Sequence, residues 1–84
     1  TLYCPRTGIA MDVITDCPGI QFYSGNFFDG SSKGKYGKEL RYRESIALET
    51  QKFPDTPHHS NFPSTLLNPG ETYTHTCVYK FEVK

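Results

Sequence analysis

The strongest pattern in the chain is the alternation of side chains near its end. From Tyr73 to Val83 the odd positions hold Tyr, His, Cys, Tyr, Phe and Val, and the even positions hold Thr, Thr, Val, Lys and Glu. Successive side chains of a strand point to opposite faces, so this pattern predicts an antiparallel strand with one half-buried apolar face. His75 falls on that face and is predicted to be a packed core histidine. No segment repeats apolar residues with the period of a helix, so the chain is predicted to be all-β.

Shorter strand-like runs occur upstream, separated by turn residues and loops. They predict three further strands, at Met11–Thr15, Ile20–Ser24 and Ser45–Thr50. The segment 29–40 holds three Gly and three Lys and is predicted to be a mobile surface loop. The segment 51–64 carries three prolines, which exclude a helix or a central strand there. Two irregular loops of this length are uncommon in a small domain unless they serve a site.

The amount of apolar material is small for an independent domain. Only 36% of the 84 residues are hydrophobic, and much of that content is 6 Phe and 6 Tyr. A chain of this size buries only about 60–65% of its unfolded surface, which leaves a lone domain marginally stable. The sequence also does not begin with Met. We therefore expect an incomplete piece of a longer protein that folds poorly on its own.

Charge and cysteine content exclude several classes of protein. Nine basic and nine acidic residues give a formal net charge of zero, so no nucleic-acid partner is expected. No run approaches the ~18 apolar residues of a membrane span, so no membrane partner is expected either, and no signal peptide is visible. The cysteines number 3, an odd count without C-x-x-C spacing, and are expected to be free thiols. Free thiols are typical of a reducing compartment, so the predicted location is cytoplasmic.

Two polar residues within predicted strands are candidates for chemistry. Glu49 follows the apolar run 46–48, where a carboxylate that points into a cavity could act as a general base. Gln21 lies between Ile20 and Phe22, and its amide offers two donors and an acceptor for a polyol hydroxyl. Alternation alone favours solvent-facing positions for both side chains. The sequence pattern therefore does not decide between a functional role and a solvent-facing position for either residue.

The remaining motifs do not predict a metal or a cofactor. His58 and His59 are adjacent, so their side chains should diverge, and no third ligand is spaced for zinc. A structural or surface role is expected for both. The segment GSSKGK at 30–35 has the wrong glycine spacing for a phosphate-binding loop, and a tyrosine follows it where Ser or Thr is needed.

Five motifs, in a fixed order, resemble a known family. They are GIQFYSGNFFDG (19–30), LETQ (48–51), FPD (53–55), NFPS (61–64) and LNPGE (67–71), the last followed by Tyr73. Their order and spacing resemble the C-terminal part of the aldose 1-epimerases, the galactose mutarotases, over residues 1–81. The resemblance implies that residues 1–84 are the C-terminal portion of a single domain with no internal boundary. It also implies a large antiparallel β-sandwich, the galactose mutarotase-like supersandwich, which is several times longer than this chain.

The resemblance also implies a reaction and two site residues. The family interconverts α and β anomers of aldohexoses such as galactose and glucose by acid–base ring opening and closure. The glutamate of its LETQ motif, here Glu49, is the general base, and the glutamine of its G-[VI]-Q-x-Y segment, here Gln21, contacts sugar hydroxyls. No cofactor or metal is implied. The family's acid histidine lies upstream of this stretch, so the segment alone is expected to be inactive. Its expected partner is the missing N-terminal part, on this chain or on a companion chain.

Two departures from the family pattern leave these positions in place. Glu44-Ser45-Ile46 stands where the family usually has Ser-Gly before an aromatic residue, and Lys52 follows LETQ where an aromatic or histidine is common. Two alternatives to an enzyme remain at this stage. One is a non-catalytic carbohydrate-binding member of the same superfamily, and the other is a small β interaction module.

Overall fold

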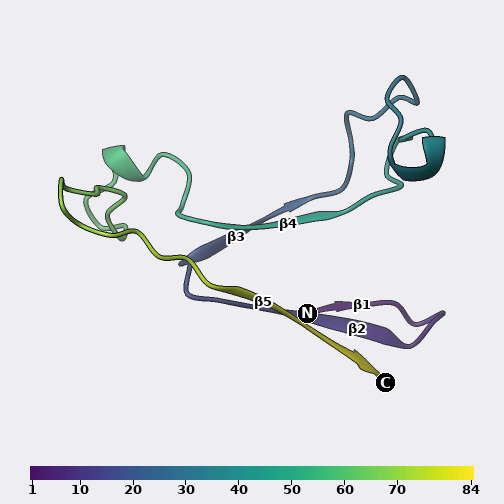
Figure 1. Cartoon of the computed structure of the whole chain (residues 1–84), viewed down its shortest axis with the longest axis horizontal. Coiled ribbons are helices and arrows are strands. Elements are labelled where there is room, and N and C mark those ends of the chain that lie inside the picture. Colours follow the sequence, from purple (N-terminus) through teal and green to yellow (C-terminus); the bar gives the residue numbers. More distant parts are fainter. The chain divides into compact units, whose positions relative to one another are not determined.

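A computed structural model describes all residues from Thr1 to Lys84 (Figure 1). It contains five strands and two short 3-10 helices, and no longer helix. The chain divides into two compact units, one made of Thr1–Gly19 and Thr50–Lys84 and the other of Ile20–Glu49. None of the helices is long and apolar enough to cross a membrane. The all-β prediction is confirmed.

The first unit is built on a three-stranded antiparallel sheet. Its strands are β1 (Leu2–Tyr3), β2 (Ile9–Thr15) and β5 (Cys77–Val83), in the order β1-β2-β5. Figure 1 shows β5 lying along β2, and the register runs from Ile9↔Val83 to Thr15↔Cys77. The predicted strand at Met11–Thr15 is therefore real but begins two residues earlier. The short strand β1 has no sequence pattern of its own and was not predicted.

A glycine turn fixes the end of this sheet. Gly8 has φ +74°, and its N–H donates to the Cys4 carbonyl at 2.8 Å. The Gly8 carbonyl accepts from the Lys84 N–H, also at 2.8 Å. A Cβ at Gly8 would lie 2.8 Å from the Lys84 carbonyl oxygen. Only glycine combines this backbone conformation with so close an approach of β5 to the turn.

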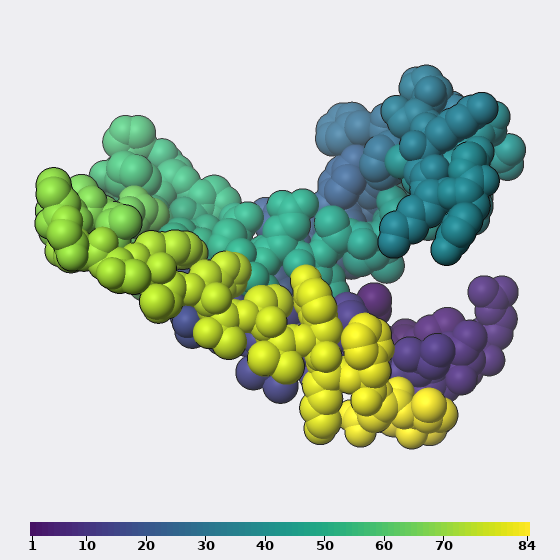
Figure 2. All heavy atoms as spheres, viewed as in Figure 1, coloured from purple at the N-terminus to yellow at the C-terminus, as the bar shows by residue number.

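The prediction that β5 has a half-buried face is wrong for this chain. Tyr79, Phe81 and Val83 are 52%, 65% and 80% exposed. Figure 2 shows the atoms of β5, in yellow, at the molecular surface. The one buried hydrophobic residue of the chain is Ala10. Alternation identified the apolar face correctly, but burial needs a second layer over that face, and this chain does not supply one.

The predicted start of β5 at Tyr73 is also wrong, because pairing begins at Cys77. The turn after β2 explains the difference. The Thr76 N–H donates to Asp16 Oδ1 at 3.0 Å, so a side chain takes the place of the backbone partner there. His75 lies beyond this point and is exposed, not packed in a core as predicted.

The second unit contains most of the pair of strands β3 (Gly19–Tyr23) and β4 (Ala47–Gln51), whose residues Gly19, Thr50 and Gln51 are counted with the first unit. Both were predicted, with bounds that differ by one or two residues. The connection between them includes the predicted surface loop at 29–40, most of whose residues are exposed. It forms an isolated antiparallel bridge, Lys33↔Glu39, around the 3-10 helix η1 (Lys35–Gly37).

Candidate functional site

The two candidate residues occupy the centres of neighbouring strands. Gln21 is the third residue of β3, and Glu49 is the third residue of β4, its hydrogen-bonded neighbour. Both are exposed. The Gln21 amide nitrogen donates to the Phe22 carbonyl at 3.1 Å. The Glu49 carboxylate forms no side-chain hydrogen bond or ion pair in the structure, so it is free to contact a ligand.

Glycine contacts place the ends of the two strands beside each other. A Cβ at Gly19 would lie 3.6 Å from the Gln51 carbonyl oxygen, and a Cβ at Gly25 would lie 2.8 Å from Ser45 Oγ. The start of β3 therefore lies beside the end of β4, and the residues just after β3 lie beside those just before β4. Gln21 is two residues after Gly19 and Glu49 is two before Gln51, so both candidates lie near the middle of the pair.

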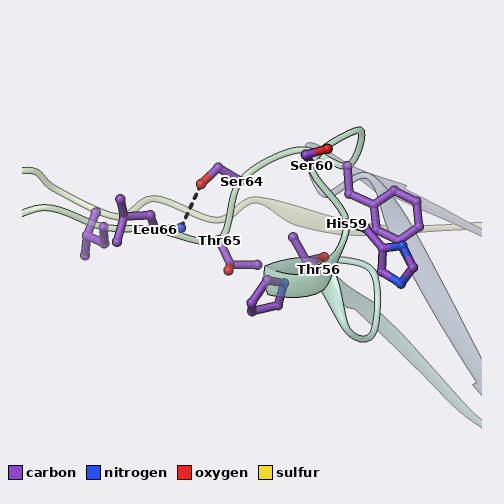
Figure 3. Close-up of a pocket in the computed structure, with 9 residues that line it drawn as sticks. Thr56, His59, Ser60, Ser64, Thr65 and Leu66 are labelled. Atoms are coloured by element: carbon purple, nitrogen blue, oxygen red, sulfur yellow. Dashed lines mark hydrogen bonds between the residues drawn. The ribbon is translucent and has the colours of Figure 1, made fainter.

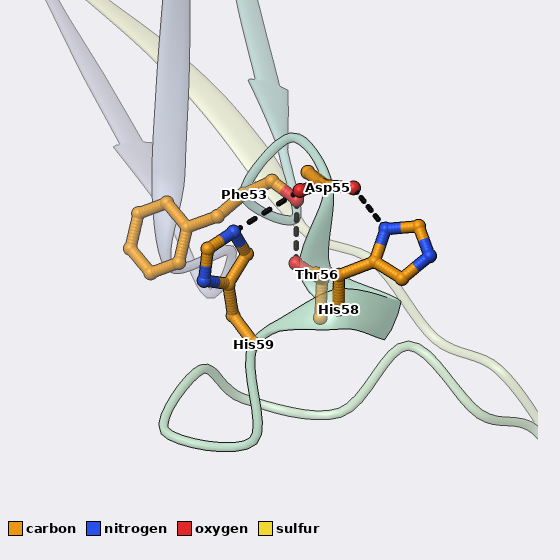
Figure 4. Close-up of polar contacts among 5 residues, drawn as sticks. All are labelled: Phe53, Asp55, Thr56, His58 and His59. Carbon is orange, nitrogen blue, oxygen red and sulfur yellow. Dashed lines mark hydrogen bonds and ion pairs between the residues drawn. The ribbon is translucent and has the colours of Figure 1, made fainter.

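The segment after β4 contains a second polar arrangement. The 3-10 helix η2 (Thr56–His58) follows Asp55, whose carboxylate is hydrogen-bonded to both adjacent histidines (Figure 4). Asp55 Oδ1 lies 2.5 Å from His58 Nδ1, and Oδ2 lies 3.1 Å from His59 Nε2. The two rings diverge on either side of the carboxylate, as adjacency predicts. The sequence analysis missed Asp55 as their common partner, although the i, i+3 and i, i+4 spacing could have suggested it.

A pocket of about 540 Å³ lies beside η2 (Figure 3). The His59 ring stacks on Phe62, with centroids 4.6 Å apart, and the Phe62 ring contacts Phe53 at 5.2 Å. Ser64 Oγ accepts the Leu66 N–H at 3.1 Å and shapes the opposite wall. The lining residues are Thr56, Pro57, His59, Ser60, Phe62, Ser64, Thr65, Leu66 and Leu67. Neither candidate residue lines this pocket.

Three potential metal ligands meet at the end of the β2–β5 ladder. They are Asp16, Cys17 and His75, and one ligand atom from each lies within 4.8 Å of the others. His75 Nε2 is hydrogen-bonded to Thr50 Oγ1 at 3.0 Å. No motif in the sequence predicts this group, because the first two residues and the histidine are about sixty positions apart.

Comparison with known proteins identifies the family. The sequence profile of a family described as Aldose 1-epimerase matches residues 1–80. The chain therefore belongs to the aldose 1-epimerase family, and the resemblance drawn from the five motifs is confirmed.

Individual relatives agree with this assignment. The chain is 47% identical to proteins named galactose mutarotase from Mus musculus and Homo sapiens, over 96% of this chain and 25% of each relative. It is 37% identical to a protein named aldose 1-epimerase from Escherichia coli, over 87% of this chain and 21% of that protein. The chain thus spans about a quarter of the length of these relatives.

Proposed function

We propose that this chain is part of an aldose 1-epimerase that interconverts the α and β anomers of aldohexoses such as galactose and glucose. Family membership over residues 1–80 carries the proposal. In it, residues 1–84 are the C-terminal portion of a single domain without an internal boundary. The remaining part, on this chain or on a companion chain, supplies an acid histidine. The cytoplasm is the proposed location, which suits the three free thiols.

Glu49 is the proposed general base. Its carboxylate takes the proton of the C1 hydroxyl, the C1–O1 bond becomes a carbonyl, and the bond between C1 and the ring oxygen breaks. The acid histidine gives a proton to the ring oxygen at the same stage. Rotation about the C1–C2 bond and closure with the reverse proton transfers produce the other anomer. The exposed, unpaired state of the Glu49 carboxylate supports this role, because the base must be open to a sugar.

Gln21 is the proposed substrate-binding residue. Its place at the centre of β3, next to the strand that carries Glu49, would let its amide hold a neighbouring sugar hydroxyl while Glu49 acts at C1. An amide can both donate to and accept from hydroxyls, which suits a polyol. The reaction moves protons without any net oxidation or reduction, so the proposed mechanism includes no cofactor.

The test is replacement of the base in the intact protein. Glu49→Gln keeps the shape of the side chain but cannot accept a proton, so mutarotation of α-galactose and α-glucose, followed by polarimetry, should slow by ~10²–10⁴. The base-dependent limb of the pH–rate profile should disappear with it. Glu82→Gln, which changes another exposed strand glutamate, is the matched control and should retain the wild-type rate.

Thermal melts of both variants separate lost chemistry from lost folding. A folded Glu49→Gln variant with near-wild-type mutarotation would show that Glu49 is not the base. If the wild-type protein binds aldoses but interconverts none of them, the non-catalytic carbohydrate-binding function replaces the enzymatic one.

A further inference from the structure

The end of the β2–β5 ladder brings a carboxylate, a thiol and an imidazole together. β2 ends at Thr15 and β5 begins at Cys77, which are paired in the register. The residues just after β2 and just before β5 therefore meet at the same end of the sheet. We propose that Asp16, Cys17 and His75 bind one Zn²⁺ ion, with water as the fourth ligand.

Hydrogen bonds between side chains and the backbone hold the first two residues in place. The Thr76 N–H donates to Asp16 Oδ1 at 3.0 Å, which leaves the other carboxylate oxygen available. Thr15 Oγ1 donates to the Thr76 carbonyl at 2.9 Å and accepts the Cys17 N–H at 3.1 Å. These bonds tie the turn after β2 to the segment before β5, so the site does not need to be assembled from a free loop.

The spacing of the ligand atoms is close to that of a metal site. One atom from each of Asp16, Cys17 and His75 lies within 4.8 Å of the others. Zinc bonds of about 2.0–2.3 Å in tetrahedral geometry place ligand atoms roughly 3.3–3.8 Å apart. The three side chains therefore need to close by about 1 Å, which rotation of exposed side chains can provide.

The mixture of ligands selects the metal. Sulfur, imidazole nitrogen and carboxylate oxygen together suit zinc, whereas Mg²⁺ and Ca²⁺ require oxygen ligands alone. Asp16 and His75 are exposed and Cys17 is half-buried, so the fourth position opens to water. The hydrogen bond between His75 Nε2 and Thr50 Oγ1 leaves Nδ1 for the ion and orients the ring. Such an outer partner is a usual feature of histidine–zinc sites.

The test uses the purified intact protein, freed of metal by a chelator and titrated with Co²⁺. We expect binding of one ion per chain, with a thiolate-to-cobalt charge-transfer band, and displacement of that ion by Zn²⁺. Cys17→Ser should remove the band. His75→Gln and Asp16→Asn should weaken zinc binding at least 10-fold. Thr50→Val removes only the hydrogen-bond partner of His75 and should weaken zinc binding 10- to 100-fold. Cys4→Ser and His58→Gln are matched controls and should change nothing.

A second measurement needs no variant. Zn²⁺ should slow alkylation of Cys17, followed residue by residue by mass spectrometry, and should leave alkylation of Cys4 unchanged. Equal alkylation rates with and without Zn²⁺, or a cobalt band that survives Cys17→Ser in a folded protein, would overturn the proposal. Mutarotation is not measured in either test, so the outcome is independent of the proposed enzymatic function.

Discussion

Gly25 is the position where a single methyl group should disturb the β3–β4 pair most. It is buried, has φ +68°, and lies two residues after the end of β3. A Cβ there would lie 2.8 Å from Ser45 Oγ and 3.1 Å from a ring carbon of Phe28. Gly25→Ala therefore faces two separate penalties. A left-handed backbone costs a residue with a Cβ about 1–2 kcal/mol, and overpacking costs about 1–3 kcal/mol more.

Gly37 offers a control that separates the two penalties. Its φ of +69° matches that of Gly25, but nothing lies within 4 Å of the Cβ it would carry. Gly37→Ala should therefore lower the free energy of unfolding by about 1–2 kcal/mol, from the backbone alone. Gly25→Ala should lower it by about 2–5 kcal/mol, the sum of both penalties.

A double-mutant cycle tests the cause of the difference. Ser45→Ala removes the oxygen that the new methyl group meets, so the pair Gly25→Ala/Ser45→Ala should be more stable than the two single effects predict. Urea denaturation of the intact protein, compared at unchanged m-value, measures each variant. Mutarotation should fall with Gly25→Ala, because the strain lies at one end of the strand pair that carries Gln21 and Glu49. The reasoning fails if Gly25→Ala costs no more than Gly37→Ala, or if the two positions show no coupling.

Four further results are expected. Gln21→Ala should raise KM more than it lowers kcat. The loss of one hydrogen bond should lower kcat/KM by roughly 2- to 13-fold. An unchanged KM for every aldose would remove Gln21 from the site. The hydrogen bond from the Thr1 hydroxyl is the main cause that holds the pKa of Asp12 below its usual range, so the charged form adds stability above pH ~4 that is lost as the pH falls through the lowered value. Asp12→Asn should therefore flatten the acid side of the stability profile measured by urea midpoints, and an unaltered slope would contradict this. Residues 1–84 alone should show no cooperative thermal transition, because ordering costs about 1–2 kcal/mol per residue and the chain buries one hydrophobic residue. Under denaturing, non-reducing conditions the thiols of Cys4, Cys17 and Cys77 should all titrate as free. A stoichiometric disulfide would argue against a cytoplasmic location.

Local pattern predicted the strands well but predicted their burial poorly. The runs that became β2 and β3 are bounded by Gly and Pro, and Pro54 follows β4; these residues act locally and can be read from the sequence. The start of β5 depends on the Asp16 side chain, about sixty residues away, so alternation alone placed it too early. His75 was assigned to a core for the same reason. It lies before the strand begins, and a core also requires a covering layer that the pattern of one strand cannot reveal.

The candidate sites also differ in whether local sequence could predict them. Gln21 and Glu49 came from motifs that lie within strands, and those two strands are neighbours in the structure. The hydrogen bonds of Asp55 with His58 and His59 were within reach of sequence reasoning, because they span three and four residues. The group formed by Asp16, Cys17 and His75 depends on which two strand ends meet. That is a property of topology, and no spacing in the sequence encodes it.

The position of β5 at the edge of its sheet has a practical consequence. Seven residues of extended backbone present an unpaired row of peptide groups on one side, beside exposed Tyr79, Phe81 and Val83. Such an edge is a template for β-pairing between molecules. Lys80 and Glu82 are the only charges in the strand that oppose self-association. Residues 1–84 made alone should therefore collect in inclusion bodies, and a strand that caps this edge during synthesis should keep them in solution.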